Sequence, residues 1–231
     1  MTDLDIGMNQ RLSEPFAWDD ARRYDRGKIM TAEMLESGRD FGRYKDVDGD
    51  GIPWRTWPGT HPDKGAYFTR GTSRNPQAQY SERGPDYVYN MQRLLKKLET
   101  AVRMAPQPVV QPAAQPTRLG VLYFGSTSAA MAEALDALAA QGIHLDAMRV
   151  CAFPFAESVR AFIDAHDPVY VVEQNRDAQM RTMLMTELDA NPSRLQRVLH
   201  YDGTPITARF IIDAIARHAH QTAAESPPEA A

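Results

Sequence analysis

The sequence predicts an α/β fold, with a parallel or mixed β-sheet and flanking helices in the second half of the chain. An irregular, loop-rich segment with one helix precedes it. Three observations lead to this prediction. Four apolar runs of strand length alternate with helical patterns after residue 118, a proline-rich stretch separates the halves, and the first half shows little hydrophobic periodicity. Alternating strands and helices are typical of a mostly parallel sheet with helices on both faces.

Four strand–helix units account for the second half. Each unit begins with an apolar run that fits a strand and continues with apolar residues at helical spacing. The predicted strands are residues 119–125, 144–153, 168–175 and 195–203. The predicted helices are residues 126–142, 156–166, 176–188 and 207–219, and Gly142 is the stop signal of the first of them.

The first half contains one clear helix, at residues 85–104. Its apolar stripe consists of Tyr87, Met91, Leu94, Leu98 and Val102. The segment before this helix is rich in Gly, Pro, Asp and Arg, and compact domains rarely contain so long a loop. We therefore expect the first half to lie against a structure that this chain does not supply.

The predicted organisation has four parts. Residues 1–104 form the loop-rich part, and residues 105–117 form a proline-rich linker. Residues 118–220 form the α/β domain, and residues 221–231 form a frayed tail.

Composition excludes several classes of protein. The single cysteine, Cys151, rules out a disulfide framework and a cysteine-ligated metal cluster within this chain. No apolar run reaches the ~20 residues of a membrane helix, and the N-terminus has no signal-peptide pattern. The net charge is −4 with no basic stripe, which predicts no nucleic-acid partner. We expect a cytoplasmic protein that binds neither membrane nor nucleic acid.

The stretch DVDGDGIPW, residues 46–54, begins like a calcium loop. Asp46, Asp48 and Asp50 stand at alternate positions, and a glycine follows. The twelfth position of the loop holds Trp57, where a calcium loop needs a bidentate carboxylate. A turn whose aspartates accept backbone hydrogen bonds is the main interpretation, and a weak metal site stays open.

A hydroxyl-rich loop follows the first predicted strand of the sheet. Gly125 and Ser126 to Ser128 stand between this strand and a helix, a place where backbone N–H groups can hold a phosphate. The arrangement resembles the phosphate loop of flavodoxins, although it has one glycine and no dinucleotide or Walker motif. A stand-alone flavodoxin-like module that binds FMN is therefore an alternative function. The other interpretation is an ordinary helix cap.

Polar side chains gather at the predicted carboxyl edge of the sheet. Ser126, Glu173, Asn175 and Asp202 each follow a strand, and open α/β sheets bind ligands at this edge. Asn175 is a candidate helix cap, and Glu173 is a candidate acceptor for a partner's backbone. These four residues are candidates for a subunit interface or a ligand site.

Longer stretches resemble a known family. They are TDLDIGMN, YDRGKIMTAE, FGRYKDVDGDGIPWRTWPGTHPDKGAYFTRGTS, VYVVEQNRDAQMR and LHYDGTPITAR. Together they resemble the alpha subunit of 2-oxoacid:ferredoxin oxidoreductases, in particular the 2-oxoglutarate type, over about residues 2–217. The resemblance implies oxidative decarboxylation of a 2-oxoacid on thiamine diphosphate and magnesium, electron transfer through an iron–sulfur cluster to ferredoxin, and release of an acyl-CoA.

The resemblance also implies a division of labour. Residues 118–220 are similar to the transketolase C-terminal domain, and residues 1–104 are similar to the end of the pyrimidine-binding domain. The family's upstream region, with its Tyr-Pro-Thr-Pro stretch and an acidic residue on the aminopyrimidine, has no counterpart here. Arg74 stands where the family usually has a histidine. No catalytic or cofactor-binding residue is therefore carried over.

The resemblance thus identifies the chain as the C-terminal part of an alpha subunit. It implies a fragment, a split gene product or a truncated reading frame. We expect the cofactors to bind mostly to parts absent from this chain, and the chain alone to be inactive. Its expected task is structural, as the part that docks against the beta subunit.

Overall fold

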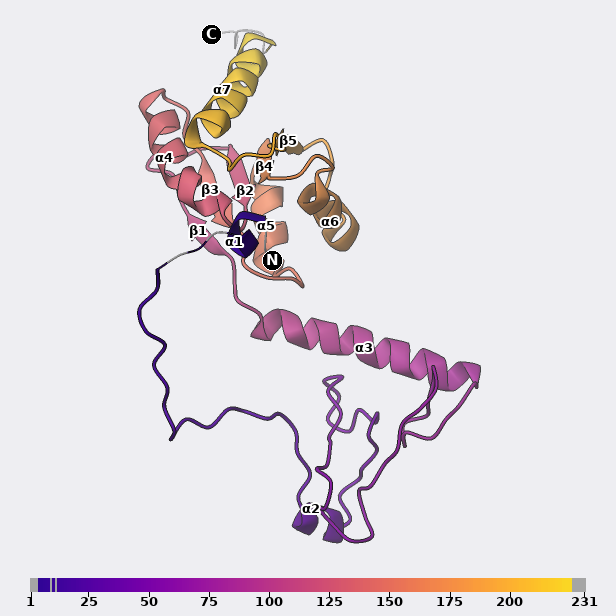
Figure 1. Ribbon diagram of the computed structural model, residues 1–231. Coiled ribbons are helices and arrows are strands. Elements are labelled where there is room, and N and C mark those ends of the chain that lie inside the picture. Colours follow the sequence, from indigo (N-terminus) through magenta and orange to yellow (C-terminus); the bar gives the residue numbers. More distant parts are fainter. Residues whose placement is uncertain (1–3, 9, 11, 226–231) are drawn as a thin grey trace. The chain divides into compact units, whose positions relative to one another are not determined.

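The computed structural model describes residues 4–8, 10 and 12–225 (Figure 1). The contacts divide the chain into two compact units. Residues 1–12 and 105–231 form one, which we name the sheet unit, and residues 13–104 form the other, which we name the loop-rich unit.

The sheet unit contains a five-stranded mixed sheet with the strand order β1-β3-β2-β4-β5. The strands are β1 (Val109–Gln111), β2 (Gly120–Tyr123), β3 (Asp146–Arg149), β4 (Val169–Glu173) and β5 (Leu195–Leu199). Strands β3, β2, β4 and β5 run parallel to one another, and β1 pairs with β3 in the antiparallel direction. The predicted parallel or mixed sheet is confirmed.

Helices cover both faces of this sheet (Figure 1). The four that follow the parallel strands are α4 (Thr127–Ala140), α5 (Glu157–Ala165), α6 (Gln179–Leu188) and α7 (Ala208–Glu225). Gly142 ends α4 with φ +81°, a conformation that glycine adopts without strain, as the sequence predicts. All four predicted strand–helix units are confirmed.

Alternation along the strands divides the core into two apolar clusters. Val121 of β2 packs with residues of α4 and α7, whereas its neighbour Leu122 packs with residues of α5 and α6. All five residues of β4 are buried, because this strand lies between β2 and β5 and is covered on both faces. The sheet unit thus holds the main hydrophobic core of the molecule.

Strand β1 lies inside the predicted proline-rich linker. Its three residues pair with β3 as an edge strand, so this part of the linker belongs to the sheet. Proline is tolerated beside an edge strand because the outward N–H groups need no partner in the sheet. The sequence did not predict this strand. Residues 221–225 of the predicted frayed tail belong to α7, and residues 226–231 lie outside the described residues.

The loop-rich unit has two helices, α2 (Ala32–Glu36) and α3 (Gly84–Met104), in an otherwise irregular chain. Helix α3 confirms the predicted helix at residues 85–104. The five-residue helices α2 and α1 (Leu4–Met8), the second of which lies in the sheet unit, were not predicted. No helix among the described residues is both long and apolar enough to cross a membrane.

Candidate functional site

Glu173 ends β4 and is fully buried. Its carboxylate accepts hydrogen bonds from the backbone N–H groups of Met180 (2.7 Å) and Arg181 (3.0 Å), in the first turn of α6. A third bond comes from Asn175 Nδ2 at 2.8 Å. A carboxylate at a helix N-terminus satisfies free N–H groups and interacts favourably with the helix dipole. Glu173 therefore anchors α6 to the end of β4, and its acceptor role serves this chain's own backbone.

Asn175 completes this anchor. Its Oδ1 accepts from the backbone N–H groups of Asp177 (3.1 Å) and Gln179 (3.2 Å). The two side chains thus hold the β4–α6 turn from both sides. This turn also carries Ala178 in a left-handed conformation with φ +53°, which costs free energy that these hydrogen bonds offset.

Gln174 links the next part of the edge, and sequence reasoning missed it. Its Nε2 donates to Ser126 Oγ at 2.7 Å and lies 3.3 Å from Thr127 Oγ1, while its Oε1 accepts from Ile206 N at 3.4 Å. The side chain thereby joins the start of α4, the end of β4 and the segment before α7. Gln174 lies between Glu173 and Asn175, directly after a buried strand, and this position could have marked it as a candidate.

The hydroxyl-rich loop is already occupied by side chains of its own unit. Ser126 Oγ accepts from Gln174 and donates to Asp5 Oδ2 at 3.4 Å, and Ser128 Oγ donates to the Gly125 carbonyl at 2.8 Å. A carboxylate beside the N-terminus of α4 repels a phosphate at this point. The geometry does not favour the FMN-binding alternative.

Asp202 stands apart from the other three candidates. Its Oδ1 accepts from the backbone N–H (2.9 Å) and the hydroxyl (2.7 Å) of Thr204 and lies 3.3 Å from Nε2 of the buried His200. The hydrogen bond from the Thr204 hydroxyl lowers the pKa of the Asp202 carboxyl. These contacts describe a turn after β5. The structure thus brings Ser126, Glu173 and Asn175 to one edge through Gln174, whereas Asp202 contacts Thr204 and His200.

The aspartates of residues 46–54 do not meet at one point. Lys28 Nζ lies 2.7 Å from Asp48 Oδ2 and 2.7 Å from Asp50 Oδ2, so an ammonium group stands between these two carboxylates. Asp48 also accepts from Trp54 Nε1 at 2.7 Å. Asp46 has different surroundings: its backbone N–H donates to the Tyr89 hydroxyl, and its buried Oδ1 has no hydrogen-bond partner among the described residues. Within the described ranges, no group of three or more His, Cys, Asp or Glu side chains is arranged as metal ligands.

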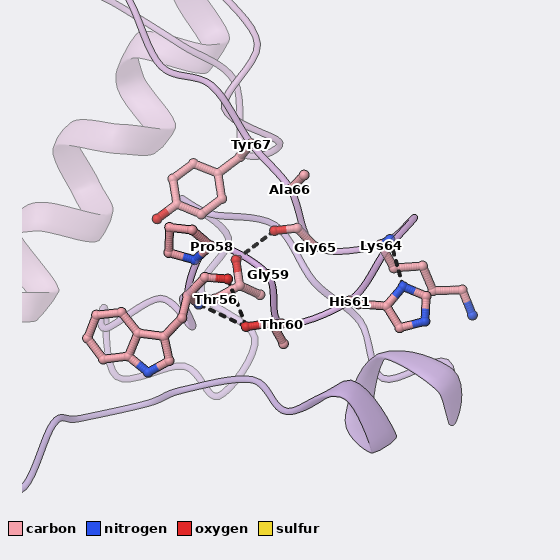
Figure 2. A pocket seen from close by; sticks show the side chains of 10 residues that line it. Thr56, Pro58, Gly59, Thr60, His61, Lys64, Gly65, Ala66 and Tyr67 are labelled. Carbon is pink, nitrogen blue, oxygen red and sulfur yellow. Dashed lines mark hydrogen bonds between the residues drawn. The ribbon is translucent and has the colours of Figure 1, made fainter.

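A pocket of about 360 Å³ lies among residues 56–67 (Figure 2). His61 Nδ1 accepts from the backbone N–H groups of Asp63 and Lys64, and Nε2 binds the Glu36 carboxylate. Both ring nitrogens therefore bind groups of the loop-rich unit itself. Thr56 Oγ1 donates to the Gly65 carbonyl at 2.6 Å. The polar groups of this pocket stabilise its own turns.

The comparison with known proteins gives a result for the fold. No family model matches the chain. The chain is similar to the 2-oxoglutarate:ferredoxin oxidoreductase from Magnetococcus marinus, solved with 2-oxoglutarate, coenzyme A and succinyl-CoA bound. The match has a TM-score of 0.67 and 18% sequence identity, and covers 78% of this chain and 31% of that chain. The matched regions share a fold. This chain therefore corresponds to about a third of that chain's length.

Two further solved structures match less of the chain. A split gene transketolase, described as an inactive β4 tetramer, has a TM-score of 0.41 and 17% identity over 48% of this chain and 40% of that chain. The alpha chain of a "probable 2-oxoacid ferredoxin oxidoreductase" from Thermoplasma acidophilum has a TM-score of 0.34 and 20% identity, over 49% and 97%. Both TM-scores are too low to define a common fold.

Proposed function

We propose that this chain is part of the alpha subunit of a 2-oxoacid:ferredoxin oxidoreductase of the 2-oxoglutarate type, working in the cytoplasm. Its task is to dock against the beta subunit, and it has no activity alone. One observation carries the proposal. The likeness to the Magnetococcus marinus enzyme covers 78% of the chain, which is more than the sheet unit contains. The match therefore includes part of the loop-rich unit, whose irregular course few unrelated proteins would share.

The chemistry belongs to the complete enzyme. Thiamine diphosphate, magnesium and an iron–sulfur cluster would supply decarboxylation and electron transfer there, with a 2-oxoacid, coenzyme A and ferredoxin as reactants. The residues of this chain do not fit a cluster, because four thiolates are needed and Cys151 is the only cysteine. We assign the cofactors to other parts of the enzyme.

Helix α3 supplies the docking surface. Its apolar side chains are between 39% and 62% exposed: Tyr87, Val88, Met91, Leu94, Leu95 and Leu98. Soluble proteins rarely leave a contiguous apolar stripe uncovered, and such a stripe marks an interaction site. We assign the beta subunit as its occupant, because the structural neighbour is a 2-oxoacid oxidoreductase and this chain corresponds to a third of its chain.

Co-expression with a beta subunit from the same genome tests the docking. We expect a stable complex on size-exclusion chromatography. Leu95→Glu should weaken it more than tenfold, because a carboxylate would enter an apolar contact. Gln92→Glu is the matched control, since Gln92 is an exposed, polar residue of the same helix. Equal effects of the two substitutions, or no complex with the unmodified chain, would overturn the docking role.

An activity assay tests the reaction class. The complex, supplied with the rest of an alpha subunit, should reduce a viologen dye in the presence of 2-oxoglutarate, coenzyme A and thiamine diphosphate. The chain alone should reduce none. Pyruvate in place of 2-oxoglutarate measures which 2-oxoacid the enzyme prefers. If the complex forms but fails to reduce the dye with either 2-oxoacid, the oxidoreductase proposal is wrong.

A further inference from the structure

Cationic side chains converge on one pocket of the loop-rich unit. The pocket has a volume of about 380 Å³, and none of the described residues that line it is a carboxylate. Its basic residues come from distant parts of the sequence: Arg26, Lys28, Arg43, Arg55, Arg93 and Lys97. A concave site of this size, with convergent charged groups, is typical of a small-ligand site.

Five of these six cations have no carboxylate partner in the part of the chain that the structure describes. Lys28 is neutralised by Asp48 and Asp50, as described above. None of the others forms an ion pair with a carboxylate of the described residues. Clustered like charges repel one another, so the unit carries an electrostatic cost that an anion in the pocket would relieve.

Arg93 shows this cost most clearly. It is only 8% exposed, and its Nη1 donates to the Gly51 carbonyl at 3.1 Å, while its Nε has no hydrogen-bond partner among the described residues. Burial lowers the pKa of the Arg93 guanidinium, and the charge of Arg43 lowers it further. A guanidinium keeps its charge in proteins, so the molecule holds a buried, incompletely satisfied cation at the pocket wall.

The aspartate-rich loop builds the pocket. Gly51 has φ +77°, and a Cβ atom there would lie 2.3 Å from the backbone nitrogen of Lys97. The loop therefore packs directly on α3, and Ile52, Pro53 and Arg55 line the same pocket as Arg93. Lys28 holds the other side of the loop through Asp48 and Asp50. The calcium-like sequence thus has a structural task, which is to form one wall of this pocket.

We infer that this pocket binds a multivalent phosphate anion, such as a diphosphate group. Phosphate oxygens point in several directions, so cations from separate segments can each form a charge-assisted bond. A planar carboxylate satisfies two donors side by side and leaves the others unmatched. Arginine forks suit phosphate geometry, and four of the six cations are arginines. The inference does not rest on the proposed oxidoreductase function.

Calorimetric titration of the full chain with sodium pyrophosphate tests the inference. We expect saturable binding at one site, tighter than for inorganic phosphate and at least tenfold tighter than for 2-oxoglutarate, a dicarboxylate. Added sodium chloride should weaken it. Arg43→Gln and Lys97→Gln should each reduce affinity about tenfold, the loss expected for one charge-assisted bond. Arg43→Lys should fall between, because it keeps the charge and loses the fork.

Arg70→Gln and Arg83→Gln are the controls. Both arginines are exposed, lie in the same unit and are not among the residues that line the pocket. Unchanged tryptophan fluorescence would show that the variants are folded, since Trp18, Trp54 and Trp57 all lie in this unit. Absence of saturable binding, equal losses in the control variants, or tighter binding of 2-oxoglutarate would each overturn the inference.

Discussion

Different interactions stabilise the interior of each of the two units. The sheet unit has two apolar clusters, one on each face of the sheet. The loop-rich unit, within the residues described, buries only three hydrophobic side chains, Met30, Leu35 and Ala78. It has charged contacts instead. All seven cation–π contacts recorded for the described chain lie in it, as in Arg39 over Trp54 at 4.1 Å.

This difference predicts how the stability of each unit depends on pH, ionic strength and bound partners. Apolar burial contributes roughly 25 cal/mol per Å² and depends little on salt or pH. Exposed ion pairs contribute little each and are screened by salt. We therefore expect the sheet unit to be the more stable one, and the loop-rich unit to depend on pH, ionic strength and bound partners.

The same substitution, leucine to alanine, should have very different effects on stability in the two units, and this is the largest difference that we predict. Leu184 of α6 is fully buried in the apolar cluster that α5 and α6 form with the sheet, whereas Leu95 of α3 is 62% exposed. Leu184→Ala should lower the free energy of unfolding of the sheet unit by about 3–4 kcal/mol, because it leaves a cavity. Leu95→Ala should change that of the loop-rich unit by less than about 0.5 kcal/mol.

Urea unfolding followed by two signals separates the units. Tryptophan fluorescence reports on the loop-rich unit, which holds all three tryptophans, and circular dichroism adds the sheet unit. A cost for Leu95→Ala as large as that for Leu184→Ala would show that α3 is covered within the free chain.

The next effect lies in the loop-rich unit and depends on backbone packing. Gly51→Ala should destabilise this unit by about 3 kcal/mol, because the new Cβ would overlap the backbone of Lys97 and alanine disfavours a positive φ. Gly59→Ala is the control. Gly59 has φ +80° with nothing within 4 Å of the added atom, so only the conformational cost of about 1 kcal/mol applies. Tryptophan fluorescence during thermal unfolding measures both.

Much of the sheet unit could be predicted because its pattern is local. An apolar run such as that of β4 and helical spacing such as that of α4 are set by residues close in sequence, and Gly142 marks a helix end by its own conformational freedom. Strand β1 escaped prediction because its pairing with β3 is a tertiary contact and prolines surround it.

The candidate sites were harder to predict for the same reason. Glu173 and Asn175 were found because polar residues directly follow a strand, but their partners on α6 became clear only from the fold. The basic pocket has no linear signal, since Arg26, Arg55 and Lys97 are far apart in sequence and meet only in the structure. A net charge of −4 conceals such a cluster.

A substitution with a smaller expected effect tests whether Glu173 stabilises the sheet unit. Glu173→Gln should lower the free energy of unfolding of that unit by about 2 kcal/mol. The three N–H donors share two carboxylate oxygens of Glu173, whereas the amide of glutamine has only one acceptor oxygen. Glu187→Gln changes an exposed carboxylate of α6, the helix that Glu173 anchors, and should have almost no effect. Urea unfolding followed by circular dichroism measures both. A stability unchanged by Glu173→Gln would point to a role other than anchoring α6.

The smallest effect concerns acid. The hydrogen bond from Lys28 lowers the pKa of Asp48. Burial acts to raise the pKa of Asp50, but the bond from Lys28 outweighs it, so that pKa is lowered too. A depressed carboxyl pKa contributes stability that is present above the unfolded value of about 3.9 and is lost as the pH falls through the folded value. The loop-rich unit should therefore melt at a lower temperature below about pH 4.

Thermal unfolding by tryptophan fluorescence between pH 7 and pH 3 measures this effect, and Trp54 lies next to the pair because it donates to Asp48. The double variant Asp48→Asn, Asp50→Asn should show a lower melting temperature at pH 7 and a weaker fall in acid, because the charges that Lys28 neutralises are gone. Asp63→Asn, at an exposed position of the same unit, should behave as the unmodified chain. High salt should reduce the difference between the double variant and the unmodified chain. A melting temperature that rises as the pH falls would instead mean that the two carboxylates repel each other more than Lys28 attracts them.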